Sequence, residues 1–263
     1  MPKIKINATE FYYELHGKGQ PIVMISGYTC DSQFYLQLID ELKDNYQLLI
    51  FDNRGIGQTK DDGKPFTAEI MAKDVIDLCD ALDIHKPSIL GQSMGGTIAQ
   101  TIAANYPEKI NKLILVATSA KWRQAMLKGL GSILDLGKAG CDIDLILNAA
   151  IPWVYGEKFL SNPENINDFK KAVLTNPFMQ SLSDQSRQYE VLIKFNGLDA
   201  LSKITANTLI LYGTEDLISL PTESQFLSEH IKNSSIKAIE CGHDIPNEAT
   251  KEIAVEVSNF LAE

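Results

Sequence analysis

Two kinds of apolar pattern alternate along the chain and predict its strands and helices. Continuous apolar runs, which are typical of strands buried on both faces, occur at residues 21–25, 47–51, 88–90, 113–116, 208–212 and, more weakly, 236–239. Between these runs, apolar residues recur at helical spacing, for example at Phe34, Leu38 and Leu42. Regular alternation of strand and helix predicts an α/β fold with a doubly wound, mostly parallel sheet.

Two regions depart from this alternation. Residues 3–6 alternate apolar and polar and are followed by a second extended run at 10–15, which predicts an opening hairpin. In the middle of the chain, helical segments separated by Gly and Pro replace the strand pattern, and aromatic residues are concentrated there. Because the α/β pattern then resumes, we expect residues 120–200 to form a helical cap insertion, over one edge of a core made of residues 1–119 and 201–263.

Composition and charge narrow the class of protein. Of the 263 residues, 44% are hydrophobic and 22% are charged, which is ordinary for a globular protein. The formal net charge of −10 gives a surface that repels phosphate backbones, so we expect no nucleic-acid partner. No apolar run approaches the ~18 residues of a membrane span, and the start of the chain lacks the apolar core of a signal peptide. A cytoplasmic location without a membrane span is therefore expected.

The sequence contains no motif for a metal or a cofactor. Its four cysteines form no C-x-x-C pair and have no histidine at ligand spacing, so neither a structural metal nor a disulfide framework is predicted. The G-K-[ST] and G-x-G-x-x-G sequences of phosphate-binding loops do not occur either. We therefore expect no metal and no bound cofactor.

The strongest chemical signal is a G-x-S-x-G sequence at residues 91–95. A buried strand leads into it and a helix, expected from Thr97 onward, leads out. Such a sharp strand-to-helix turn strains the serine backbone and exposes its hydroxyl, and the flanking Gly91 and Gly95 leave room for it. This context predicts that Ser93 is a nucleophile and that the Met94 N–H, at the start of the helix, stabilises an oxyanion.

A serine nucleophile needs a base and an acid that orients the base. His243 follows the last predicted strand, and loops at the carboxyl ends of strands form the sites of open α/β sheets. Asp216 follows the preceding strand, with Glu215 as the neighbour most easily confused with it. The chain order Ser93, Asp216, His243 therefore predicts a catalytic triad.

A second oxyanion donor is expected in the loop after the first buried strand. Gly27 allows a turn there, and we assign the Tyr28 N–H as the donor. For the Tyr28 side chain two roles remain open: its hydroxyl reaches the site, or its ring only packs.

Several landmarks occur in one order over almost the whole chain: residues 25–27, 52–57, 91–96, 213–216, and Gly242-His243 with Glu248. With them the sequence resembles the α/β-hydrolase superfamily, and within it the small bacterial esterases and lactonases around 3-oxoadipate enol-lactonase and pimeloyl-carrier-protein methyl esterase. One departure is that Ser26-Gly27 stands where His-Gly is usual. The resemblance implies a changed loop behind the oxyanion hole with its backbone donor retained.

Motif and resemblance together predict a serine hydrolase that cleaves a small-molecule carboxylic ester or lactone through an acyl-enzyme. The aromatic insertion suggests a small or medium apolar acyl or alcohol part. Two alternatives stay open: a carbon–carbon bond hydrolase or perhydrolase on the same triad, and a small-molecule receptor that retains the fold. The carbon–carbon bond hydrolases usually carry Asn before the nucleophile and Trp after the histidine, whereas this chain has Gln92 and Asp244. The oligomeric state is open.

Overall fold

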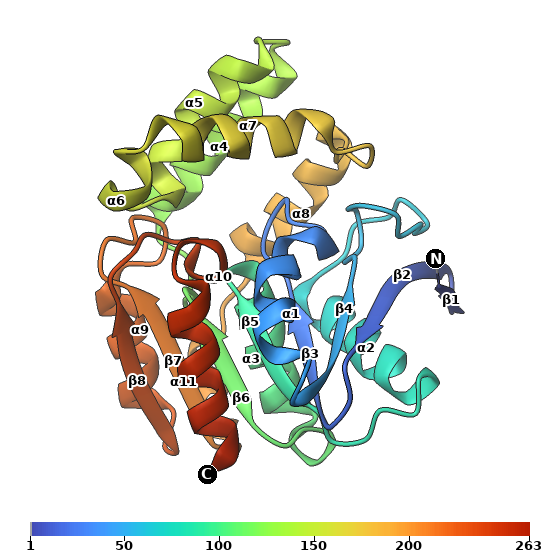
Figure 1. The fold of residues 1–263 in the computed structure, drawn as a ribbon. Helices are drawn as coiled ribbons and strands as arrows, with labels where there is room; N and C mark the ends of the chain where they lie inside the picture. Colours follow the sequence, from blue (N-terminus) through green and yellow to red (C-terminus); the bar gives the residue numbers. More distant parts are fainter. Residues whose placement is uncertain (1) are drawn as a thin grey trace.

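The computed structural model describes residues 2–263 and contains one eight-stranded sheet, in the order β1-β2-β4-β3-β5-β6-β7-β8 (Figure 1). Its strands are β1 Lys3–Ile6, β2 Thr9–His16, β3 Gln20–Ile25, β4 Tyr46–Phe51, β5 Ser88–Gln92, β6 Leu113–Val116, β7 Thr208–Gly213 and β8 Ser234–Ile239. Strands β3 to β8 run parallel, whereas β1 and β2 form an antiparallel hairpin that joins the sheet at β4. The predicted doubly wound, mostly parallel sheet and its opening hairpin are confirmed.

The central strands are buried on both faces because helices cover both sides of the sheet. In β3, Ile22 and Met24 belong to one apolar cluster, and Val23 and Ile25 belong to the other. The first cluster includes residues of α1 Leu36–Leu42 and α11 Thr250–Ala262. The second includes residues of α2 Ala68–Ala81, α3 Met94–Asn105 and α9 Pro221–His230. This two-sided burial explains why the strands appear in the sequence as continuous apolar runs.

The segment between β6 and β7 is mainly helical. It contains α4 Gln124–Lys138, α5 Ile143–Val154, α6 Glu157–Leu160, α7 Pro163–Thr175, α8 Leu182–Lys194 and η3 Leu198–Lys203. In Figure 1, α4 to α8 lie together above one end of the sheet. That end carries the carboxyl ends of the parallel strands, since Val154 at the end of α5 accepts a hydrogen bond from His243, just after β8. We call residues 120–200 the insertion below.

The other short elements lie around the same end of the sheet or connect strands. They are η1 Ser32–Tyr35, η2 Pro107–Lys109 and α10 Ile245–Glu248. Among the described residues, no helix has both the length and the apolar character needed to cross a membrane.

Helix α3 begins three residues earlier than predicted, at Met94 instead of Thr97. The apolar period starts only at Ile98, and glycine is a weak helix former, so Gly95 and Gly96 hide the first turn in the sequence. Their presence has a packing cause. A Cβ on Gly95 would lie 1.9 Å from the carbonyl oxygen of Ile25, so only glycine lets α3 start this close to β3.

Candidate active site

Ser93 occupies the sharp turn between β5 and α3 that the motif predicts. Its backbone has φ 54° and ψ −118°, in the left-handed region that a residue with a side chain seldom adopts. The two flanking glycines are required by contact, since a Cβ on Gly91 would lie 2.3 Å from the Gly95 carbonyl oxygen and one on Gly95 would meet Ile25. The strained turn is therefore held by close packing on both of its sides.

Two hydrogen bonds, one to the backbone of β6 and one from a side chain in the loop after it, also hold the turn. The Ser93 N–H donates to the Val116 carbonyl oxygen at 2.9 Å, and the Thr118 hydroxyl donates to the Ser93 carbonyl oxygen at 2.7 Å. Thr118 is buried. No motif in the sequence marks this threonine, because its role comes from the neighbouring strand that packing brings alongside.

His243 and Asp216 meet at the carboxyl ends of β8 and β7. The His243 Nδ1 and Asp216 Oδ2 atoms are 2.8 Å apart, and both side chains are buried. The second oxygen of Asp216 accepts the N–H groups of Ile218 and Ser219 at 2.8 and 2.9 Å, which fixes the orientation of the carboxylate. The structure thus places Asp216 against the imidazole, whereas Glu215 accepts a hydrogen bond from the insertion at Glu157.

The Gln92 side chain, next to Ser93, links the end of β5 to the loop that carries His243. The Gln92 amide donates to the His243 carbonyl oxygen at 3.3 Å, so the strand end before the turn contacts the histidine loop. Within residues 2–263 no hydrogen bond joins the Ser93 hydroxyl to His243. In hydrolytic sites this contact often tightens only when substrate is bound.

The loop after β3 supplies the second candidate oxyanion donor. Gly27 lies against the turn, since a Cβ on it would be 3.2 Å from the Ser93 Cβ atom. Neither the Tyr28 N–H nor the Met94 N–H has a hydrogen-bond acceptor within the described residues. Ser26 stands where the resemblance leads us to expect histidine. Its hydroxyl donates to the Cys30 carbonyl oxygen at 2.8 Å, which closes the loop.

The Tyr28 side chain packs against the insertion. Its ring centroid lies 6.4 Å from that of Tyr189 on α8, and the ring packs against the apolar cluster that includes residues of α2, α3 and α9. Burial raises the pKa of the Tyr28 hydroxyl above its usual range, so the group stays protonated. The contact with Tyr189 shows that this ring packs between the loop after β3 and α8.

The insertion also makes polar contacts with the loops after β3 and β4 through Gln188, to which the sequence assigned no role. The loop after β3, which carries Gly27, Tyr28 and Thr29, is called the oxyanion loop below. This fully buried amide accepts the Thr29 N–H at 3.2 Å and donates to the Arg54 carbonyl oxygen at 2.9 Å. A signal was present: Gln188 is spaced with Val191 and Leu192 on the buried face of α8. A polar residue on an apolar helix face requires partners for its amide.

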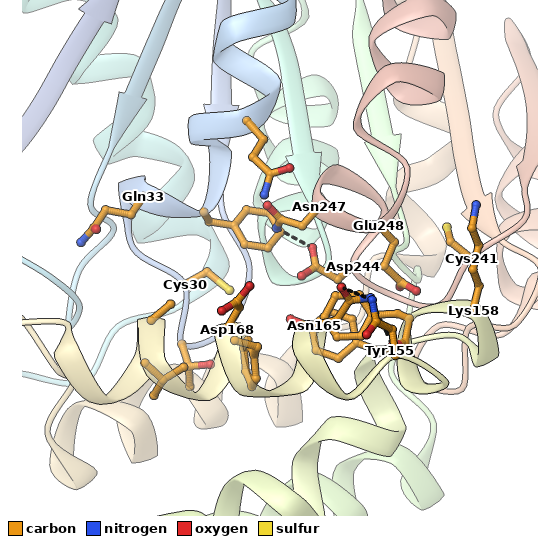
Figure 2. Close-up of a pocket in the computed structure, with 18 of the residues that line it drawn as sticks. Cys30, Gln33, Tyr155, Lys158, Asn165, Asp168, Cys241, Asp244, Asn247 and Glu248 are labelled. Atoms are coloured by element: carbon orange, nitrogen blue, oxygen red, sulfur yellow. Dashed lines mark hydrogen bonds between the residues drawn. The ribbon is translucent and has the colours of Figure 1, made fainter.

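A cavity of about 780 Å³ lies between α7 of the insertion and the core, beside these loops. Thr29 and Asp244, the neighbours of Tyr28 and His243, contribute to its lining. Figure 2 shows Tyr155, Asp244 and Glu248 grouped on one wall. Burial raises the pKa of Asp244, and it raises that of Glu248 to about 7. Within residues 2–263 no group of acidic, histidine or cysteine side chains forms a candidate metal site.

Comparison with known proteins supports the fold described above. A model of the alpha/beta hydrolase fold matches residues 20–138. A thermophilic esterase from Thermogutta terrifontis has a similar structure, with a TM-score of 0.87 and 25% identity, covering 100% of this chain and 98% of that chain. The chain has the α/β-hydrolase fold. The resemblance that the sequence motifs indicate is therefore confirmed.

Proteins of similar sequence carry several hydrolase names. The 3-oxoadipate enol-lactonase 2 of Acinetobacter baylyi is 26% identical over 79% of this chain and 75% of its own length. The putative carbamate hydrolase RutD of Azorhizobium caulinodans is 23% identical over 92% of this chain and 91% of its own length. Because one fold hosts many reactions, the activity of this chain has to be argued from its own site.

Proposed function

We propose that this α/β-hydrolase is a serine hydrolase that cleaves a carboxylic ester or lactone through an acyl-enzyme. The observation that carries the proposal is the 2.8 Å contact between His243 Nδ1 and Asp216 Oδ2, at the same end of the sheet as the strained Ser93. An imidazole held at Nδ1 presents Nε2 as a base, which a serine hydroxyl requires. The hydrolase names of the relatives support the same assignment.

The mechanism starts at Ser93. Its Oγ attacks the carbonyl carbon of the substrate while His243 Nε2 takes the hydroxyl proton, and Asp216 stabilises the resulting imidazolium. The Tyr28 and Met94 N–H groups donate to the oxyanion of the tetrahedral intermediate. When the intermediate breaks down, His243 gives the proton to the departing alcohol oxygen. A water then attacks the acyl group by the same route, which releases the acid and restores Ser93.

The walls beside the site favour an uncharged substrate with a small or medium apolar part. Tyr155, Phe159 and Phe169 of the insertion line the cavity with aromatic surface. Exposed carboxylates share the lining, including Asp168 and Glu240, and these repel a substrate that carries a free carboxylate of its own. We therefore place neutral esters and lactones ahead of anionic ones.

The proposal is tested with a panel of short-to-long acyl esters and lactones, assayed against the wild type and Ser93→Ala. We expect turnover of neutral members by the wild type and none by the variant. Undiminished turnover by Ser93→Ala would remove the serine mechanism. Turnover confined to carbon–carbon or peroxide substrates would favour the alternative reactions on the same triad, and tight ligand retention without turnover would favour a receptor.

We also propose that the protein works in the cytoplasm. All four cysteines are free thiols, and free thiols persist in a reducing compartment. Fractionation of cells that express the full chain, with activity followed in each fraction, tests this location.

A further inference from the structure

The backbone of the insertion crosses directly over the histidine loop. Between α5 and α6, the Val154 carbonyl oxygen accepts the N–H groups of His243 at 2.7 Å and of Asp244 at 3.2 Å. We call residues 154–157 the crossing segment. Because two successive N–H groups of the histidine loop bind one carbonyl oxygen, a displacement of the crossing segment displaces the backbone that carries the imidazole.

The Glu248 carboxylate joins the same two pieces of backbone. Its Oε2 atom accepts the Gly156 N–H of the crossing segment at 2.8 Å, and its Oε1 atom accepts the Gly242 N–H at 3.0 Å. Gly242 immediately precedes His243. One side chain on α10 therefore holds the insertion and the histidine loop at a fixed separation, with both carboxylate oxygens in use (Figure 2 shows Glu248 beside Asp244).

The two backbones touch, which leaves little freedom in that separation. A Cβ on Gly156 would lie 2.8 Å from the Gly242 nitrogen, and a Cβ on Gly242 would lie 2.5 Å from the Gly156 nitrogen. Gly156 has φ −80° and ψ 169°, a conformation open to any residue, so only this contact demands glycine. An alanine at position 156 therefore pushes the crossing segment and the histidine loop apart without straining its own backbone.

The crossing segment also contacts the loop that carries the acid. The Glu157 N–H donates to the Glu215 carboxylate at 2.6 Å, and Glu215 immediately precedes Asp216. Both members of the imidazole–carboxylate pair thus sit on loops that the same four residues of the insertion bind. A general base has to be held within a fraction of an ångström of its working place.

We infer that Glu248 is a positioning residue. Because it binds both the crossing segment and Gly242, the position of His243 depends on the position of the insertion. The inference rests on the proposed serine-hydrolase function. It assigns the insertion a second role besides lining the cavity, since the insertion then helps to set the rate of the chemical step.

Three variants probe this link, with one matched control. Glu248→Gln keeps the shape but replaces one accepting oxygen by an amide that cannot accept, so one of the two N–H groups loses its partner. Glu248→Asp keeps the charge on a shorter side chain, and Gly156→Ala moves the crossing segment while leaving every charged group in place. The control is Glu252→Gln, on an exposed position of α11.

Two rates are measured per active site, with sites counted by complete fluorophosphonate labelling: the labelling rate constant, and kcat for p-nitrophenyl acetate. We expect both to fall about 10-fold to 100-fold in Glu248→Gln and Gly156→Ala, the range that misplacement by up to about 1 Å produces. KM should change less than kcat, Glu248→Asp should recover part of the rate, and the control should match the wild type.

Wild-type rates per labelled site in Glu248→Gln and Gly156→Ala would overturn the inference, even if fewer sites were labelled, because a merely structural role removes sites without slowing the survivors. Ser93→Ala is run alongside to keep the two claims apart. If Ser93→Ala still turns over the ester, the proposed function fails. If Ser93→Ala is inactive while the Glu248 and Gly156 variants are unimpaired per site, only the positioning role fails.

Discussion

The core and the outer part of the insertion are built in different ways. In the core, α3 buries ten of its 12 residues between the sheet and its neighbours, whereas α7 of the insertion buries none of its 13. Most apolar residues of α5 to α7 gather in a small cluster around Leu147, Ile151 and Tyr155, and only the end of α5, at Trp153 and Val154, also packs on a cluster of the sheet. The core fixes Ser93 by packing. The insertion packs onto the core through apolar residues of α4 and α8, such as Met126, Leu127 and Val191, and its outer helices add hydrogen bonds to the core.

Because of this difference, we expect the core to determine the stability of the protein and the insertion to adjust the geometry of the site. A well-packed core resists change, because each buried methylene removed leaves a gap that the surroundings fill only in part. The insertion contacts the loops of the reacting groups through Val154 and Gln188, and through Gly156, whose N–H donates to Glu248 of the core. We expect core variants to act on folding or abolish the chemistry, and insertion variants to change its rate in a folded protein.

The largest effect is expected within the imidazole–carboxylate pair of the core. In Asp216→Asn, an amide faces His243 Nδ1 and favours the wrong tautomer, so kcat should fall on the order of 10⁴-fold. The thermal midpoint should change little, because the amide oxygen can still accept the Ile218 and Ser219 N–H groups. Steady-state kinetics with p-nitrophenyl acetate and a melting curve check both points, with Asp199→Asn on an exposed position as the control. A loss below tenfold would speak against this role of Asp216.

The next largest effect is a difference in the free energy of unfolding between a core variant and an insertion variant. Leu211 in β7 is fully buried, and Leu145 in α5 is 62% exposed. Leu211→Ala should lower the free energy of unfolding by about 2–5 kcal/mol, and Leu145→Ala should change it by less than about 0.5 kcal/mol. Urea unfolding of both variants measures the difference. Similar losses in the two variants would mean that the outer insertion is packed as firmly as the core.

Much of the core was predictable because its signals are local. Runs such as residues 208–212 show two-sided burial, and Gly91 and Gly95 mark a turn that only glycine fits. Asp216 lies beside His243 because the ends of neighbouring strands in a parallel sheet share one edge, and this edge can be inferred from the sequence. At these positions the residue types alone indicate the structure that the whole fold adopts.

The contacts between insertion and core could not be predicted in the same way. The Val154 carbonyl oxygen binds His243 through groups that every residue carries, so no residue type marks them. The sequence marks Glu248 only as a landmark of the resemblance and Glu215 only as an alternative to Asp216. Their contacts are not visible in it, because their partners are backbone N–H groups of distant segments. Long-range backbone hydrogen bonds become visible only when the structure brings the two segments together.

A smaller effect is expected where the insertion meets the oxyanion loop. Gln188→Met keeps the length of the side chain but leaves the Thr29 N–H and the Arg54 carbonyl oxygen without their partner. We expect fluorophosphonate labelling to slow about 10-fold, because each of the two groups left without its partner costs about 1–3 kcal/mol and the loop shifts to relieve part of that cost. The control is Gln185→Met on the same helix. Equal rates in both variants would show that the oxyanion loop holds its shape without the insertion.

The smallest effect concerns pH and the carboxylate that joins the two regions. Burial raises the pKa of Glu248 from its ordinary 4.5 to about 7, so between these values the folded protein binds more protons than the unfolded chain. The free energy of unfolding should therefore fall as pH rises through this window, by less than the full linkage value because the side chain is partly exposed. Glu248→Gln should lose this part of the slope. Unfolding curves at pH 5, 6 and 7 compare the two proteins, and parallel slopes would contradict the raised pKa.

The central claim is that Ser93 is the nucleophile and that His243 activates it. The most direct measurement is mass spectrometry of the protein after fluorophosphonate treatment, with the adduct located by peptide mapping. We expect one adduct per chain, on Ser93, that is absent from Ser93→Ala and forms far more slowly in His243→Ala. An adduct on another residue, or undiminished labelling of Ser93→Ala, would contradict it.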